Sequence, residues 1–201
     1  MLKLETKTRN LSLLSHALTV GGLLWCGYVI SKNLFPDPIL TAAEAGDTAQ
    51  VEALLNKGAN IEAKNGTGMT PLMRAAEFGR IETVKVLLAR GANISASDDS
   101  GCTALRVAAS PEGHAETVAF LLKSGAKPNV TDNEGRTALL WASAYGNAET
   151  VQTLIAHGAD VNLRDRSGKT ALLMAAGDKQ ELPSNPGNAE SEKALRGAGA
   201  R

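Results

Sequence analysis

Apolar residues after position 35 form short stripes that come in pairs. Leu72 and Ala75 lie at helical spacing in one stretch, and Val84 and Leu87 do so in the next, with polar residues between them. Each stretch is shorter than an isolated helix needs to be stable in water. The pattern therefore predicts pairs of short helices that bury their apolar sides only by stacking against neighbouring pairs.

The paired stripes recur because the sequence repeats itself every 33 or 34 residues. Each copy has a glycine, then a threonine two residues later and a leucine two residues after that. Threonine is a favoured N-cap, Pro71 suits the first helical position, and glycine ends helices in the left-handed conformation. The marker therefore predicts where each pair begins. Its four clear copies start at Gly68, Gly101, Gly135 and Gly168.

This unit resembles the ankyrin repeat, whose signature runs G-x-T-P-L-H-x-A-A and later L-L-x-x-G-A. Residues 68–92 read GMTPLMRAAEFGRIETVKVLLARGA, and the resemblance covers about residues 37–201. It implies an all-α fold, an ankyrin-repeat solenoid of paired antiparallel helices joined by β-hairpin turns. The motif's histidine is missing from every copy, and we expect this to weaken the ties between neighbouring turns without changing the fold. The residues in its place are Met73, Arg106, Leu140 and Leu173.

The register of the motif divides the expected ankyrin repeat domain, residues 36–201, into five repeats. Their approximate bounds are 36–65, 66–98, 99–132, 133–165 and 166–201. The first lacks its leading turn, and the third has an extra residue beside Ser110 that predicts a wider turn between its helices. The last is degenerate, with a loop predicted at 178–187. Its polar second helix suits a cap, although a disordered tail that matches by chance is the alternative.

The N-terminal part carries a different signal, a 20-residue run at 11–30 with no formal charge except a possible one on His16. A helix of that length reaches about 30 Å, the thickness of a bilayer core. We therefore predict a basic tail at 1–10, a transmembrane helix or signal-anchor at 11–30 and a linker at 31–35. Cleavage as a signal peptide and burial as a soluble helix are the alternatives.

The orientation of this single-pass span follows from the charges before it. Lys3, Lys7 and Arg9 precede the span, and basic flanks favour the cytoplasmic side. The ankyrin domain is then expected on the outer, periplasmic side of the membrane. If the span is cleaved instead, the expected product is a soluble periplasmic or secreted protein.

Charge and composition argue against several functions. The chain has as many basic as acidic residues, and the part from Pro36 onward holds 17 basic and 20 acidic ones. A nucleic-acid partner needs a clustered positive face, so none is expected. No nucleophile motif, phosphate-binding loop or metal-ligand spacing is present, and His114 and His157 fit solvated turns. We therefore expect no catalytic residues, metal, cofactor or small-molecule substrate, and no disulfide between Cys26 and Cys102.

Protein binding is the function that the resemblance implies. In similar proteins the hairpin tips and the ends of the first helices line a concave face that binds a partner. Phe78 and Tyr145 are the candidate anchors, with partial burial against the next repeat as the alternative, and Trp141 is expected in the core. Carried over by position, the face comprises Thr67, Met69, Glu77, Phe78, Asp99, Ser100, Cys102, Ser110, Asn133, Glu134, Arg136, Ala144, Tyr145, Arg166, Ser167 and Lys169.

The sequence thus predicts a membrane-anchored scaffold that mediates protein–protein interaction without catalysis. The linker at 31–35 spans at most about 17 Å, so the unidentified protein partner is expected at or near the membrane. The alternative is a soluble periplasmic or secreted accessory protein, released by cleavage, that assists a partner enzyme. That second interpretation rests on fold-level analogy alone.

Overall fold

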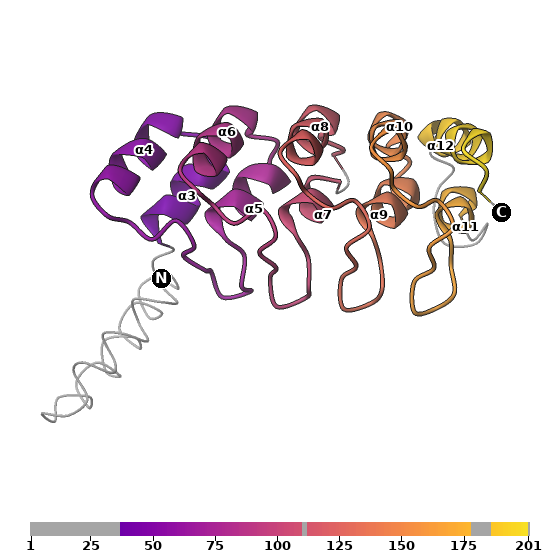
Figure 1. The fold of residues 1–201 in the computed structure, drawn as a ribbon, viewed down its shortest axis with the longest axis horizontal. Coiled ribbons are helices and arrows are strands. Elements are labelled where there is room, and N and C mark those ends of the chain that lie inside the picture. Colours follow the sequence, from indigo (N-terminus) through magenta and orange to yellow (C-terminus); the bar gives the residue numbers. More distant parts are fainter. Residues whose placement is uncertain (1–36, 110–111, 178–185, 201) are drawn as a thin grey trace, which may run out of the picture. The chain divides into compact units, whose positions relative to one another are not determined.

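The computed structural model describes residues 37–109, 112–177 and 186–200 (Figure 1). The predicted tail, span and linker at 1–35 lie outside these ranges. Within the ranges, no helix combines the length and apolarity that crossing a membrane requires. The chain divides by its internal contacts into Met1–Asp37 and Pro38–Arg201, and the second unit carries the repeats.

The second unit is a row of helix pairs, as the apolar stripes predict (Figure 1). The first helices of the pairs are α3 (Pro38–Ala45), α5 (Pro71–Glu77), α7 (Ala104–Ala108), α9 (Ala138–Ala144) and α11 (Ala171–Ala176). The second helices are α4 (Thr48–Asn56), α6 (Ile81–Ala89), α8 (Ala115–Lys123), α10 (Ala148–Ala156) and α12 (Pro186–Gly197). In Figure 1 the first helices form one layer, the second helices form another, and the segments between repeats project past the first layer.

The described residues form helices and turns but no strands, which confirms the all-α class. The expected β-hairpin turns are present only as loops. Two of them hold a single antiparallel bridge each, between Ser97 and Thr103 and between Arg164 and Thr170. The arms of these loops are a few residues long, and each tip is closed by a backbone bond of its own, such as Asp98 N to Cys102 O, and is also bonded to the neighbouring tip.

Threonine caps begin the first helices. The hydroxyl oxygens of Thr70, Thr137 and Thr170 accept hydrogen bonds from backbone N–H groups three residues later, at 3.3 to 3.4 Å. Thr103 occupies the same position without a side-chain cap. Each bond satisfies one of the N–H groups that a helix start leaves unpaired. The predicted helix starts are therefore confirmed at all four markers.

The core is one continuous cluster that runs along the row between the two layers. Leu72 is 1% exposed, and Val84 and Leu87 are fully buried, as the stripes require. The same positions are buried in the later repeats, at Leu105, Val118, Leu121, Leu139, Val151 and Leu154. A helix of five to nine residues lacks the length to stand alone, so this burial between repeats stabilises the fold.

The C-terminal repeat ends in the longest of the described helices, α12. It begins at Pro186, so the last two positions of the loop predicted at 178–187 belong to the helix, and positions 178–185 lie outside the described ranges. Leu195 is fully buried in the common core, at the position equivalent to Leu154. The degenerate sequence of the last repeat thus keeps the apolar residue that stacking needs.

The loops between repeats end in tips that are joined along the row. We call residues 65–69, 98–102, 132–136 and 165–169 the tip row. Each tip begins with an aspartate or asparagine whose Oδ1 accepts N–H bonds from two later residues of the same tip. Backbone bonds then tie one tip to the next, from Asp99 N to Thr67 O, Asn133 N to Ser100 O and Arg166 N to Glu134 O. The tip row is therefore a preorganised surface.

The close spacing of these tips makes Gly68 a sensitive position. Gly68 has a φ of +81°, and a Cβ added there would lie 2.8 Å from the backbone nitrogen of Asp99. We expect Gly68→Ala to lower the free energy of unfolding by about 2 kcal/mol, because it combines left-handed strain with overlap. Urea unfolding followed by circular dichroism measures this change.

Two glycines provide matched controls for Gly68→Ala. Gly58 has a φ of +86° with open space around its Cβ position, so Gly58→Ala should cost about 1 kcal/mol from strain alone. Gly66 has neither a positive φ nor a close neighbour, so Gly66→Ala should be neutral or slightly stabilising. Equal losses for Gly58→Ala and Gly68→Ala would show that the tips are not in close contact.

Candidate functional site

The predicted concave-face residues fall into two groups in the structure. Those on the tip row are mostly exposed, and the ends of the first helices are half-buried. Exposed members are Thr67, Asp99, Ser100, Asn133, Glu134, Arg166, Ser167 and Lys169. Half-buried members are Met69, Glu77, Phe78, Arg136, Ala144 and Tyr145. Ser110 lies outside the described residues. The assignment of this face to partner binding stays a prediction.

Cys102 is the one described member that the structure buries, with 3% of its surface exposed. Its small side chain is covered within the core cluster, and burial raises the pKa of its thiol to about 11. A buried, protonated thiol offers a partner no contact surface. Cys102 is therefore covered, unlike the other described residues of the predicted face, because spacing places a residue on a tip without showing which way its side chain points. Its part in partner binding stays a prediction.

Five residues of the third and fourth repeats form the most developed side-chain arrangement at the tips. We call Arg106, Asp132, Arg136, Trp141 and Tyr145 the Trp141 cluster. The guanidinium carbons of Arg106 and Arg136 lie 4.0 and 4.4 Å from the centroid of the Trp141 ring. The Tyr145 ring stacks on Trp141 with centroids 5.5 Å apart and planes 16° apart. Cation–π contacts and offset stacking both stabilise such an arrangement.

Asp132 holds the Trp141 cluster together. Its side chain is 2% exposed. Oδ1 accepts backbone N–H bonds from Glu134 and Arg136 at 2.9 Å. Oδ2 lies 3.3 Å from both Arg106 Nη2 and Trp141 Nε1, and 3.4 Å from Arg136 Nε. One carboxylate thus joins a turn, an indole and two guanidinium groups.

These contacts set the ionisation of Asp132. Burial alone would raise the pKa of its carboxyl group. The N–H bonds from Arg136 and Glu134 outweigh burial, together with the Trp141 N–H and the charge of Arg136, so the pKa lies below its usual value of 3.8. The carboxylate is therefore negatively charged near neutral pH and balances part of the arginine charge.

Sequence reasoning missed Arg106, Asp132 and Trp141 as site residues. Arg106 replaces the motif's histidine on α7, and its side chain reaches forward to the tip of the next repeat. Trp141 was expected in the core but is half-buried, because its indole N–H bonds to Asp132 at the tip. The sequence did contain one signal for this arrangement: Arg106 stands at the motif's histidine position, in the repeat before the one that carries Trp141.

A second, smaller arrangement surrounds Phe78 at the end of α5. The guanidinium carbon of Arg74 lies 4.9 Å from the Phe78 centroid, and Arg74 forms ion pairs with Glu44 and Glu77. Phe78 and Tyr145 occupy equivalent positions in the second and fourth repeats. Both candidate anchors are therefore half-buried and in contact with a neighbouring side chain within their own repeat.

The described residues contain no group of three or more His, Cys, Asp or Glu side chains placed to hold a metal ion. The two histidines of the repeats bond to carbonyl groups of helices: His114 Nε2 lies 3.0 Å from Glu77 O at the end of α5, and His157 Nδ1 lies 2.8 Å from Thr153 O in α10. The arrangement at the tips thus offers aromatic faces and paired charges, which suit non-covalent recognition.

Comparison with known families gives a match that agrees with this architecture. The family described as ankyrin repeats (3 copies) matches residues 23–98, 39–132 and 105–182, which together span most of the chain. A comparison with curated proteins gives no match. The family match includes the four tip markers and all the first helices. The chain belongs to the ankyrin repeat family.

Proposed function

We propose that this chain is a non-catalytic scaffold that binds a protein partner on the tip-row side, with the Trp141 cluster at the centre of the contact. The observation that carries the proposal is the stack of Tyr145, Trp141 and two arginines beside exposed tips. Tryptophan, tyrosine and arginine are the residues that most often dominate binding energy at protein interfaces. Ankyrin repeats support a protein–protein interaction scaffold in general.

The geometry also favours a low entropic cost of binding. Asp132 fixes both guanidinium groups and the indole before any partner arrives. Ordering a flexible side chain at an interface costs about 0.5–1.5 kcal/mol, and these side chains are already ordered. The half-buried rings of Trp141 and Tyr145 still leave part of their surface to be covered.

Tyr145→Ala tests the position of the binding surface. The full-length protein is first used to capture and identify its partners. The affinity of each partner is then measured for the parent chain and for the variants. Tyr145→Ala is expected to weaken binding at least about tenfold, because truncating a central aromatic costs about 2 kcal/mol or more. Phe120→Ala is the matched control, since Phe120 is a half-buried aromatic on α8 in the other helix layer.

The control should change the affinity less than about twofold, since it lies away from the tips. Thermal unfolding of both variants checks that the fold is kept. The proposed surface is wrong if Phe120→Ala weakens binding and Tyr145→Ala does not. It is also wrong if neither variant changes the affinity for any captured partner.

The proposal extends to location. Residues 11–30 would anchor the chain in a membrane as a single span, with the N-terminus in the cytoplasm and the repeats on the periplasmic side. The uncharged 20-residue run and the basic residues before it support this orientation. A partner at or near the membrane is then expected because the linker is short.

Alkaline carbonate extraction followed by N-terminal sequencing tests the anchor. The expected result is a chain that stays in the membrane pellet and keeps residues 11–30. A soluble mature chain that begins after residue 30 would contradict the anchor and favour the alternative, a periplasmic or secreted accessory protein. The binding proposal does not depend on this outcome, because it concerns residues of the repeats alone.

A further inference from the structure

A polar hollow of about 330 Å³ lies between the tips of the third and fourth repeats. Its lining includes Trp141, Arg106 and Arg136 together with Asp98 and Asp99. The volume falls at the lower end of the range for ligand pockets and suits a single side chain. The hollow borders the Trp141 cluster, so the inference rests on the proposed function and concerns the chemistry of the partner.

The positive groups of the hollow are already paired. Arg106 and Arg136 both contact Asp132 Oδ2, and Arg136 Nη2 also lies 2.5 Å from Glu134 Oε2. Both guanidinium groups also lie against the Trp141 ring. An incoming carboxylate would compete with these contacts and would approach two further acidic residues, so an acidic side chain is disfavoured here.

The negative charges of Asp98 and Asp99, which also line the hollow, are not balanced by a cation among the described residues. Asp98 uses Oδ1 to accept the backbone N–H groups of Ser100 and Cys102, which orients the carboxylate without neutralising it. Asp99 is exposed, and within the described ranges neither aspartate forms an ion pair. Four carboxylates and two guanidinium groups therefore line the hollow, an excess of two negative charges.

The rim of the hollow is held in place by the tip row. Asn133 Nδ2 donates to Asp99 O at 3.0 Å, and Asn133 N donates to Ser100 O at 2.9 Å. The carboxylate of Asp99 also lies against the space that a Cβ on Gly68 would occupy. These contacts hold the neighbouring tips in place, so the hollow exists before a partner binds.

We propose that this hollow receives one basic side chain, a lysine or an arginine, of the protein partner. The ammonium or guanidinium group meets Asp98 and Asp99, while the aliphatic stem lies along the wall that Trp141 and its arginines form. Charge complementarity of this kind selects among partners and sets the register of binding more than it adds affinity. The next tip carries Arg166, and Arg164 directly precedes it, so a second basic residue placed there is repelled.

Nuclear magnetic resonance titration of the full-length protein tests the proposal directly. The probes are the blocked tripeptides acetyl-Gly-Arg-Gly-amide, acetyl-Gly-Lys-Gly-amide and acetyl-Gly-Glu-Gly-amide, at about 10 mM salt to limit screening. The readout is the indole N–H resonance of Trp141, assigned by its loss in Trp141→Phe. We expect saturable shifts with the arginine or lysine probe and none with the glutamate probe.

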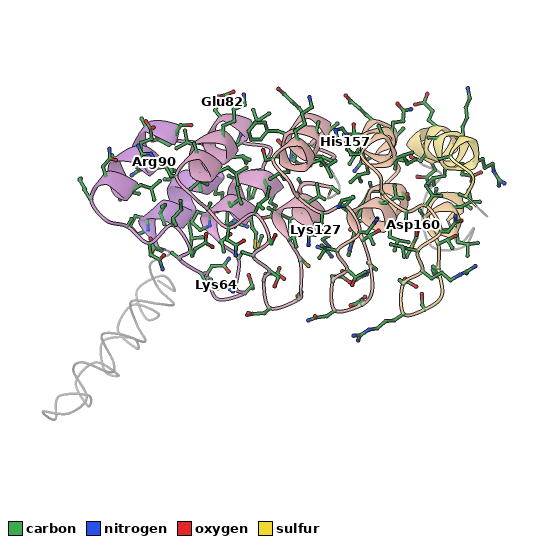
Figure 2. All side chains as sticks on the ribbon, in the orientation of Figure 1. Lys64, Glu82, Arg90, Lys127, His157 and Asp160 are labelled. Atoms are coloured by element: carbon green, nitrogen blue, oxygen red, sulfur yellow. The ribbon has the colours of Figure 1, made fainter. Side chains whose placement is uncertain are left out.

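The double variant Asp98→Asn/Asp99→Asn is expected to weaken binding of the basic probes about tenfold or more, since bonds to charged groups are lost. Asn65 already occupies the position equivalent to Asp98 and makes the same turn bonds, so the double variant should fold. Glu82→Gln is the matched control, because Glu82 lies in the layer of second helices, far from the tips (Figure 2).

Shifts that persist unchanged in the double variant, shifts with the glutamate probe alone, or no shift with any probe would each overturn the basic-side-chain assignment. The two proposals remain separable. A titration that succeeds while Tyr145→Ala leaves every partner bound rejects the proposed surface and keeps the hollow. A failed titration with loss of partner binding in Tyr145→Ala keeps the surface and rejects the hollow.

Discussion

Leu140→Ala is expected to lower the free energy of unfolding by about 2–5 kcal/mol, whereas Leu173→Ala should lower it by less than about 1 kcal/mol. The two leucines occupy the same position in the fourth and fifth repeats. Leu140 is 1% exposed inside the common core, and Leu173 is 53% exposed. The difference arises because α9, which carries Leu140, packs against α11, whereas no described first helix packs on the far side of α11.

Urea unfolding of the two variants and the parent chain measures this difference. The unfolding transition should be followed by two probes, because repeat stacks can lose cooperativity and then have no single free energy of unfolding. Similar losses for Leu140→Ala and Leu173→Ala would contradict the stacking account, since burial by the neighbouring repeat would then contribute little.

Asp132→Asn should destabilise the protein by about 3–5 kcal/mol at neutral pH, because the guanidinium groups of Arg106 and Arg136 lose the buried carboxylate with which they pair. The turn itself should survive, since Asn65 makes the same backbone bonds in the second repeat. Asp98→Asn is the control. Asp98 accepts the turn bonds and a hydrogen bond from the Cys102 thiol but forms no ion pair within the described residues, so its replacement should cost less than about 1 kcal/mol.

The same substitution should change the pH dependence of stability. The pKa of Asp132 is lowered in the folded state, so the unfolded chain binds its proton first as the pH falls. The stabilisation from Asp132 is therefore present above the unfolded pKa of about 4 and is lost as the pH falls below it.

Unfolding at pH 7 and at about pH 3 measures this contribution. The parent chain should lose more stability on acidification than Asp132→Asn does. The pKa of Asp165 is also lowered, since hydrogen bonds from Ser167 and Lys169 outweigh the effect of burial, so Asp165→Asn serves as a second reference. An equal acid-induced loss in the parent chain and Asp132→Asn would contradict the role given to this carboxylate.

The helix pairs could be predicted because their signals are local. A threonine cap, an apolar residue two positions later and a terminating glycine lie within one repeat, and the structure confirms the cap bonds at Thr70, Thr137 and Thr170. Burial of the stripes also followed from the pattern, because a helix of this length must stack to be stable.

The repeating marker does not predict the Trp141 cluster, because contacts of the cluster join different repeats. Arg106 of the third repeat lies against the Trp141 ring of the fourth, and neither residue belongs to the marker. The apolar spacing predicted Trp141 in the core, but spacing takes no account of the indole N–H group, which needs a hydrogen-bond acceptor. The motif does not predict the exposure of Leu173 either, since a motif describes a position and not the neighbouring repeat on which the burial of that position depends.

Site-specific photocrosslinking tests the central claim, that the partner lies against the tips beside the Trp141 cluster. A benzophenone side chain is placed at Ser100 on the tip row or at Lys123 at the end of α8, both of which are exposed. We expect the partner to crosslink from Ser100 and not from Lys123. Crosslinking from Lys123 alone would contradict it.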